Sequence, residues 1–290
     1  MQTELNFIEW LQQIRSPLLD IFFKGVNFFD TTHFFFLLIP ALWFGKNWKV
    51  GMRLFTIILI NRGIVSLFKD FFALPRPYEL IPNLGVIQVP GYGFPSGGAT
   101  MAVLLSGLLI SYGKGRWKWP VACAFLALVS FSRLYLGVHF PRDILAGWFL
   151  GLSLWALFVF VWPPIEKFLK NCSLPVLFVI SQGVPILLFL CIPSLFSLCV
   201  LAMGLSLGLF INAHYKIILP ETKKTKELIL RGTLGIVTSI FVYGVANLLP
   251  HSSLKICLFF QLLLVALGIS ILGAWLCLKC LYNKKNRPKI

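Results

Sequence analysis

Long apolar runs separated by short polar or basic segments dominate this chain. A bilayer-spanning helix needs about 20 predominantly apolar residues, and nine runs are candidate spans. Eight spans also fit, because only Pro193 marks the break between the sixth and seventh runs. The pattern therefore predicts an all-α, polytopic membrane bundle of about eight or nine transmembrane helices. The runs cover residues 31–45, 50–69, 97–113, 119–136, 141–162, 173–192, 197–215, 231–249 and 256–279.

The segment before the first run has a different pattern. Within residues 5–29, aromatic and aliphatic side chains alternate with Glu9, Arg15, Asp20 and Lys24. A helix with one apolar and one charged face lies in the membrane interface rather than across it. We therefore expect an amphipathic interfacial helix here.

Composition supports a membrane protein and excludes several other classes. Hydrophobic residues make up 58% of the 290 residues and charged residues 12%, whereas soluble domains average about 45–50% and 25%. This excludes an ordinary soluble globule and a disordered chain. The formal charge of +16 is concentrated in the short segments between apolar runs, so we expect no nucleic-acid partner.

Basic residues predict the orientation of the chain in the membrane. They cluster in five segments, at 46–53, 114–118, 163–172, 216–231 and the C-terminal tail. Short loops rich in Lys and Arg stay in the cytoplasm. The N-terminus is then outside and the C-terminus cytoplasmic, and the segments at 70–96 and 137–140 lie on the outer face.

Three polar motifs converge on that outer face: KDFFALPRP with Lys69 and Arg76, GYGFPSGGAT with Ser96, Gly97 and Gly98, and SRLYLGVHFPRD with Arg133, His139 and Asp143. The three cations have few acids near them in the sequence. Uncompensated Arg and Lys side chains suit a phosphate, and Arg can bind its oxygens through two donors. The motifs therefore indicate a phosphate site.

The other motif residues complete a site for phosphoryl transfer. Ser96 can cap the helix that follows it, so that the first backbone amides point toward an anion. Pro141 suits the first position of the next helix, which places Asp143 in its first turn, close to His139. A carboxylate on one imidazole nitrogen fixes the tautomer and makes the other nitrogen a better nucleophile.

The spacing K-x6-R-P, P-S-G and S-R-x5-H-x3-D resembles the signature of the type 2 phosphatidic acid phosphatases, a superfamily that includes glucose-6-phosphatase and vanadium haloperoxidases. The resemblance implies that His139 forms a phosphohistidine and that Asp143 orients it. It also implies that the phosphate is bound by Lys69, Arg76, Ser96, Gly97 and Arg133. No metal or other cofactor is implied.

Gly98 departs from the family pattern, in which a histidine at this position protonates the leaving group. The Gly98 amide can still bind phosphate, but loss of a positioned acid forfeits about 10²–10⁴ in rate. A diphosphate leaves as an oxyanion that needs little protonation, so we expect diphosphate substrates to be favoured. His33, at the start of the first run, is an alternative proton donor. Arg62, which shares a helix face with Lys69, would either form the floor of the phosphate pocket or pack against backbone carbonyls.

These patterns predict that the chain consists of three parts. Residues 1–30 form the amphipathic segment, 31–163 a membrane phosphatase core, and 164–290 additional transmembrane helices with a basic tail. We expect a lipid-phosphate phosphatase whose partner is its membrane lipid substrate, with no obligate protein partner. Two alternatives stay open: a phosphotransferase that passes phosphate to a lipid or sugar, and a non-catalytic lipid-phosphate binder or transporter.

Overall fold

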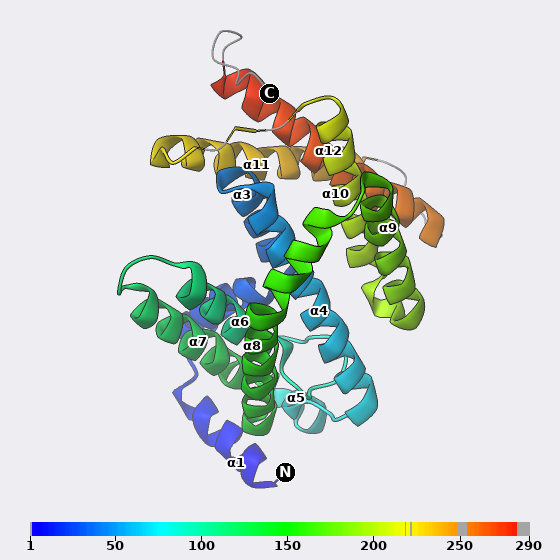
Figure 1. Ribbon diagram of the computed structural model, residues 1–290. Helices are drawn as coiled ribbons and strands as arrows, with labels where there is room; N and C mark the ends of the chain where they lie inside the picture. Colours follow the sequence, from blue (N-terminus) through cyan, green and yellow to red (C-terminus); the bar gives the residue numbers. More distant parts are fainter. Residues whose placement is uncertain (1, 218, 221, 249–253, 283–290) are drawn as a thin grey trace. The chain divides into compact units, whose positions relative to one another are not determined.

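A computed structural model describes residues 2–217, 219–220, 222–248 and 254–282, and every regular element in these ranges is a helix. The described residues form twelve α-helices (Figure 1): α1 Gln2–Leu11, α2 Pro17–Asn27, α3 Thr32–Gly45, α4 Trp48–Phe72, α5 Pro77–Leu80, α6 Gly97–Tyr112, α7 Lys118–Tyr135, α8 Pro141–Asn171, α9 Leu174–Cys191, α10 Phe196–His214, α11 Thr225–Ala246 and α12 Lys255–Leu281. Four short 3₁₀ helices lie between them: Gln12–Ile14, Phe28–Asp30, Pro82–Leu84 and Pro193–Leu195. The prediction of an all-α fold is confirmed.

The apolar helices are those of a multi-pass membrane protein. Six stretches of the described residues are long and apolar enough to cross a bilayer, and a seventh candidate pairs Pro17–Asp30 with Thr32–Gly45 across a 54° bend. The predicted count of eight or nine is therefore approximate: a helix lies in each predicted run, but α6 has only 16 residues. The six stretches are Trp48–Leu80, Pro141–Asn171, Leu174–Cys191, Pro193–His214, Thr225–Ala246 and Lys255–Leu281.

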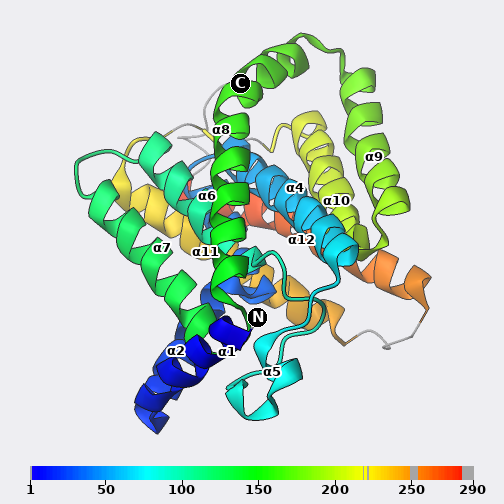
Figure 2. The same cartoon turned by 90° about the horizontal axis from the view of Figure 1, so that it is seen from below.

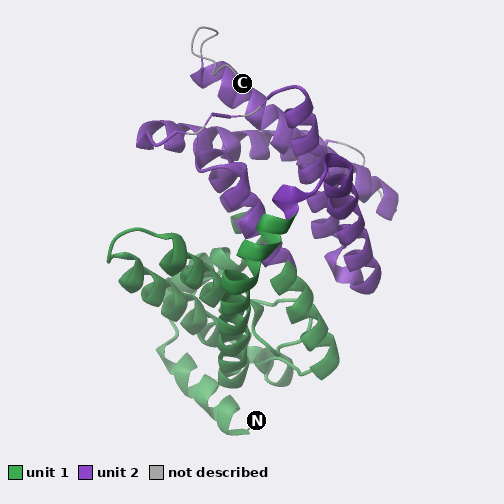
Figure 3. Ribbon diagram, in the orientation of Figure 1, with its two compact units in different colours: residues 1–34, 60–168 green, residues 35–59, 169–290 purple. Residues whose placement is uncertain are grey.

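Two compact units divide the chain (Figure 3). Unit 1 contains residues 1–34 and 60–168, and unit 2 contains residues 35–59 and 169–290. All three sequence motifs lie in unit 1.

Helices α6, α7 and α8 lie side by side in unit 1 (Figures 1 and 2). Gly147 and Gly151 of α8 face α6, where an added Cβ would come within 2.8 Å of backbone atoms of Ser96 and Thr100. Small residues four apart allow two membrane helices to approach closely. This contact places the N-terminus of α8 against the N-terminus of α6.

The N-terminal segment is two helices instead of the single interfacial helix that the pattern predicts. Ser16 breaks it, because its side chain accepts a hydrogen bond from Leu19 N and Pro17 takes the first helical position. Helix α2 then packs on α7: the rings of Phe23 and Tyr135 lie 4.3 Å apart, and the Tyr135 hydroxyl donates to Asp20 Oδ1 at 2.8 Å.

Small residues also connect the helices of unit 2. An added Cβ on Gly204 of α10 would meet Ala266 of α12 at 2.5 Å, and one on Gly45 of α3 would meet Gly232 of α11 at 3.4 Å. Asn212 of α10 donates to the Ser270 carbonyl of α12 at 2.9 Å. Unit 2 is therefore a closely packed helical bundle of its own.

Candidate active site

His139 and Asp143 form a buried pair at the start of α8. The loop that ends in Phe140 places His139 just before the helix, and Asp143 lies in its first turn. Asp143 Oδ2 accepts a hydrogen bond from Phe140 N at 2.8 Å and lies 3.4 Å from His139 Nδ1. The His139 side chain is 5% exposed and the Asp143 side chain 1%. This arrangement favours the tautomer with its proton on Nδ1, which leaves a lone pair on Nε2.

Arg76 lies beside the opposite nitrogen of the same imidazole. Its Nη1 is 3.4 Å from His139 Nε2 and donates to the Val138 carbonyl at 2.8 Å. Its Nε donates to the Gly91 carbonyl at 2.8 Å, and the residue is 1% exposed. These contacts hold the guanidinium beside Nε2, the imidazole nitrogen that faces away from Asp143.

The loop that carries Arg76 is attached to α7 and to the N-terminal segment. Val86 N donates to the Leu136 carbonyl at 3.1 Å, and the Gln12 side chain donates to the carbonyls of Leu84 and Tyr135. Gly137 adopts φ +68°, and a side chain there would clash with the Leu84 carbonyl. Only glycine therefore allows the loop to approach the turn before His139 so closely.

Ser96 brings the N-terminus of α6 to the His–Asp pair. Its Oγ accepts from Ala99 N at 3.3 Å, which makes it the N-cap as predicted. Its own N–H donates to the Asp143 carbonyl at 3.0 Å. Gly97 and Gly98 are the first residues of the helix, where backbone N–H groups have no intrahelical acceptor. Free amides at a helix N-terminus favour an anion.

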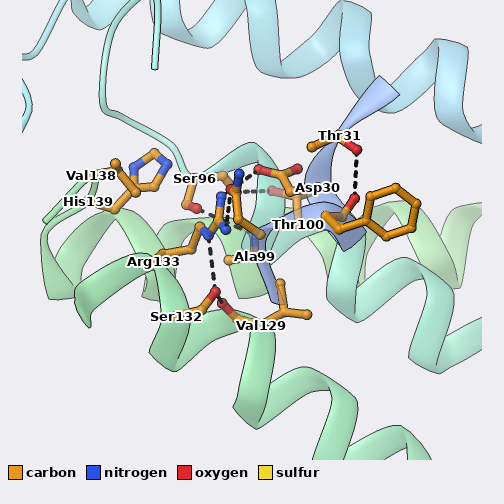
Figure 4. A network of polar contacts seen from close by, with 12 residues as sticks. Asp30, Thr31, Ser96, Ala99, Thr100, Val129, Ser132, Arg133, Val138 and His139 are labelled. Carbon is orange, nitrogen blue, oxygen red and sulfur yellow. Dashed lines mark hydrogen bonds and ion pairs between the residues drawn. The ribbon is translucent and has the colours of Figure 1, made fainter. Parts of the chain in front are cut away.

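Arg133 is the third buried cation, and it has an acidic partner (Figure 4). Its Nη1 donates to Asp30 Oδ2 at 3.0 Å, its Nη2 to Asn27 Oδ1, and its Nε to Ser132 Oγ at 3.3 Å. The expectation that all three cations are uncompensated is wrong for Arg133. Its partner comes from the distant segment before α3, which no local motif spacing can show.

The remaining predicted residues lie at different distances from this cluster. Lys69, in the last turn of α4, donates to the Tyr92 carbonyl at 2.7 Å. Arg62 donates to the Asp30 carbonyl at 3.4 Å, as in the alternative in which it binds backbone carbonyls. His33 is exposed at the start of α3.

The electrostatic environment favours a neutral His139. Burial is the main cause that lowers its pKa well below the ordinary histidine value, and the positive charges of Arg76, Lys69 and Arg133 lower the pKa further. The negative charge of Asp30 acts in the opposite direction. A neutral imidazole is the nucleophilic form, so this environment favours the form of His139 that can act as a nucleophile.

Sequence reasoning missed Asp30 and Asn27. Both precede the first predicted span, in the sequence NFFDTTH at the boundary between the amphipathic segment and that span. An acid at the end of a membrane helix is a signal for a charged partner, but the sequence does not show which cation it binds. Among the described residues, no group of three or more His, Cys, Asp or Glu side chains could hold a metal ion.

Residues 50–167 match the model of the PAP2 superfamily. The chain is 25% identical over 178 residues to lipid phosphate phosphatase delta of Arabidopsis thaliana, a match that covers 56% of this chain and 42% of the relative. It is 30% identical over 110 residues to an undecaprenyl-diphosphatase of Sulfolobus acidocaldarius, a match that covers 37% of this chain and 53% of the relative. The match to sphingosine-1-phosphate phosphatase 2 of Mus musculus is 24% identical over 258 residues and covers 83% of this chain and 72% of the relative.

The chain thus spans about half the length of the first two relatives. The matched segment contains all three motifs, from Lys69 to Asp143. The resemblance drawn from the motifs is confirmed: residues 50–167 of this chain are similar in sequence to the PAP2 superfamily.

Proposed function

We propose that this protein is an integral membrane lipid-phosphate phosphatase that works through a phosphohistidine on His139. The observation that supports this most strongly is the position of one buried imidazole between a carboxylate and a guanidinium. Asp143 Oδ2 lies 3.4 Å from Nδ1, and Arg76 Nη1 lies 3.4 Å from Nε2. A pure phosphate-binding site would not need this pair of contacts.

In the first step, His139 Nε2 attacks phosphorus and the bond from phosphorus to the leaving oxygen breaks. Asp143 stabilises the positive charge that develops on the ring. Lys69, Arg76, Arg133 and the first amides of α6 bind the phosphoryl oxygens, where charge accumulates in the transition state. Water then attacks the phosphohistidine, and phosphate and free His139 are released.

The substrate class that we propose is a lipid phosphate, with lipid diphosphates favoured. The names of the relatives refer to lipid phosphates, to undecaprenyl diphosphate and to sphingosine-1-phosphate. Gly98 lacks the imidazole that the family uses as an acid, and a diphosphate makes the smallest demand for a proton. We also propose that the site opens to the outer face and that the C-terminus is cytoplasmic, as the basic loops predict.

The test is phosphate release by the purified protein from an isoprenoid diphosphate and from a lipid monophosphate. We expect activity on both, a preference for the diphosphate, and loss of activity in His139→Ala. His214→Ala is the matched control, because His214 is exposed in unit 2. A clear preference for the monophosphate would contradict the substrate proposal, and full activity of His139→Ala would contradict the mechanism.

Gly98 also favours a second candidate, a protein that binds or transports lipid phosphates without turnover. Binding that is unchanged in His139→Ala, with no phosphate release by the parent, would support it. A phosphotransferase is distinguished in the same assay with a labelled donor: the label would appear in a lipid or sugar acceptor instead of free phosphate.

A further inference from the structure

The space beside Gly98 is filled by an acid from another part of the chain. A Cβ built on Gly98 would lie 2.7 Å from Asp30 Oδ2, 2.9 Å from its Cγ and 3.3 Å from Arg133 Cδ. No side chain larger than glycine fits at position 98 unless Asp30 moves. The carboxylate of Asp30 therefore stands where a side chain from position 98 would enter the site.

Asp30 holds a cation that a phosphate would also bind. Its Oδ2 accepts from Arg133 Nη1 at 3.0 Å, and Asp30 is only 19% exposed. A phosphoryl group that binds Arg133 would replace the carboxylate as acceptor and leave Asp30 facing an anion. A carboxylate beside a second anion takes up a proton, because two like charges at short range are costly. Substrate binding would thus convert Asp30 from an ion-pair partner into an acid.

The geometry places this acid across the site from the nucleophile. Figure 4 draws the His139 ring on one side of the Arg133 guanidinium and the Asp30 carboxylate on the other. In-line displacement requires the leaving oxygen to depart on the side opposite the attacking nitrogen. From these contacts we infer that Asp30 is the proton donor to the leaving group and stands in for the imidazole that is absent at Gly98. The inference rests on the phosphatase function proposed above.

The proton balance closes over one turnover. As the phosphorus–oxygen bond breaks, the Asp30 carboxyl gives its proton to the leaving oxygen, and the resulting carboxylate can pair with Arg133 again. In the second step the carboxylate takes a proton from the attacking water, and Asp30 is restored in its acid form. This acid matters most for a lipid monophosphate, whose leaving alkoxide needs a proton, and least for a diphosphate, whose leaving phosphate needs little protonation.

The groups that face Asp30 are mostly cationic, and any pH profile has to include them. Arg133 of α7 binds its carboxylate, and Arg62 of α4 donates to its backbone carbonyl at 3.4 Å. Three further groups interact with its charge: Lys69, Arg76 and His139.

The experiment compares leaving groups in Asp30→Asn. The substrates are a lipid monophosphate, whose alkoxide needs a proton, and p-nitrophenyl phosphate, whose phenolate departs with little need for one. We expect Asp30→Asn to lose about 10²–10⁴ in turnover of the lipid monophosphate and to keep most of its activity on p-nitrophenyl phosphate. Asp70→Asn is the control, because Asp70 is an exposed acid near the end of α4.

An equal loss on both substrates, or no loss on either, would overturn the role of Asp30. If Asp30→Asn does not fold, the double variant Gly98→His with Asp30→Ala gives the second test. Removing the carboxylate makes room for an imidazole, so this variant should recover monophosphate turnover relative to Asp30→Ala, and failure to recover it would count against the inference. The two proposals fail separately: a parent that forms no phosphohistidine overturns the phosphatase function, whereas a phosphohistidine-forming parent with a fully active Asp30→Asn overturns only Asp30.

Discussion

The carboxylate of Asp30 and the α-carbon of Gly98 are neighbours, and a methyl group on that glycine would lie 2.7 Å from Asp30 Oδ2. The two residues are 68 positions apart and belong to a short 3₁₀ helix and to the first turn of α6. Their contact joins the N-terminal segment to the second motif. It also means that the acid and the missing imidazole compete for one space.

Gly98→Ala should displace Asp30 from Arg133 and destabilise the protein by about 1–3 kcal/mol, because the buried guanidinium would lose its charged acceptor and keep only Asn27 and Ser132. The measurement is thermal unfolding in detergent. Gly97→Ala is the matched control for stability, since its Cβ would meet only Val65 Cγ1 at an ordinary 3.4 Å. Equal melting temperatures for the two variants would show that the space at Gly98 is not restricted.

Arg76→Lys should lower phosphate release about 10²–10³-fold, the usual effect of removing one positioned donor to a developing oxyanion. A lysine cannot reach both the Gly91 and Val138 carbonyls while facing His139 Nε2, because it lacks the planar guanidinium. Arg116→Lys, in an exposed loop, serves as the control. Activity of Arg76→Lys within a few-fold of the parent would contradict the position given to this side chain.

The depressed pKa of His139 predicts the acidic limb of the pH profile. Because the imidazole stays neutral in the folded protein below its ordinary pKa of 6.5, kcat/KM should not fall through His139 protonation until the pH is well below 6.5. The contribution of His139 to stability is complete above 6.5 and is lost as the pH falls toward the folded pKa. Unfolding measured against pH should show this loss in the parent and not in His139→Asn. A titration of activity centred at 6.5 would contradict the burial of the ring.

Gly137→Ala should destabilise the protein by roughly 1–3 kcal/mol through its left-handed backbone, and by more through the clash with the Leu84 carbonyl. Activity should fall with stability, because the same turn positions His139. Gly183→Ala in α9 is the control: nothing lies within 4 Å of its added Cβ, and alanine favours a helix. Thermal unfolding of both variants checks the prediction, and an unchanged Gly137→Ala would refute it.

The helices and the motif geometry could be predicted from the sequence to different extents. Apolar runs located the helices because each run has to satisfy its own backbone in a membrane. The N-cap at Ser96 and the first-turn position of Asp143 followed from local rules and are observed. Local rules do not reach Asp30, because its ion pair with Arg133 joins positions 103 residues apart. The break at Ser16 was missed because the apolar face of the N-terminal segment continues across it.

The most direct test of the central claim is to trap the phosphoenzyme. The parent and His139→Ala are mixed with a ³²P-labelled lipid diphosphate, quenched in alkali and digested, and the labelled peptide is identified by mass spectrometry. The account predicts an alkali-stable, acid-labile phosphate on His139 in the parent and none in His139→Ala. Phosphate release by a parent that carries no label on His139, or label that persists in His139→Ala, would contradict it.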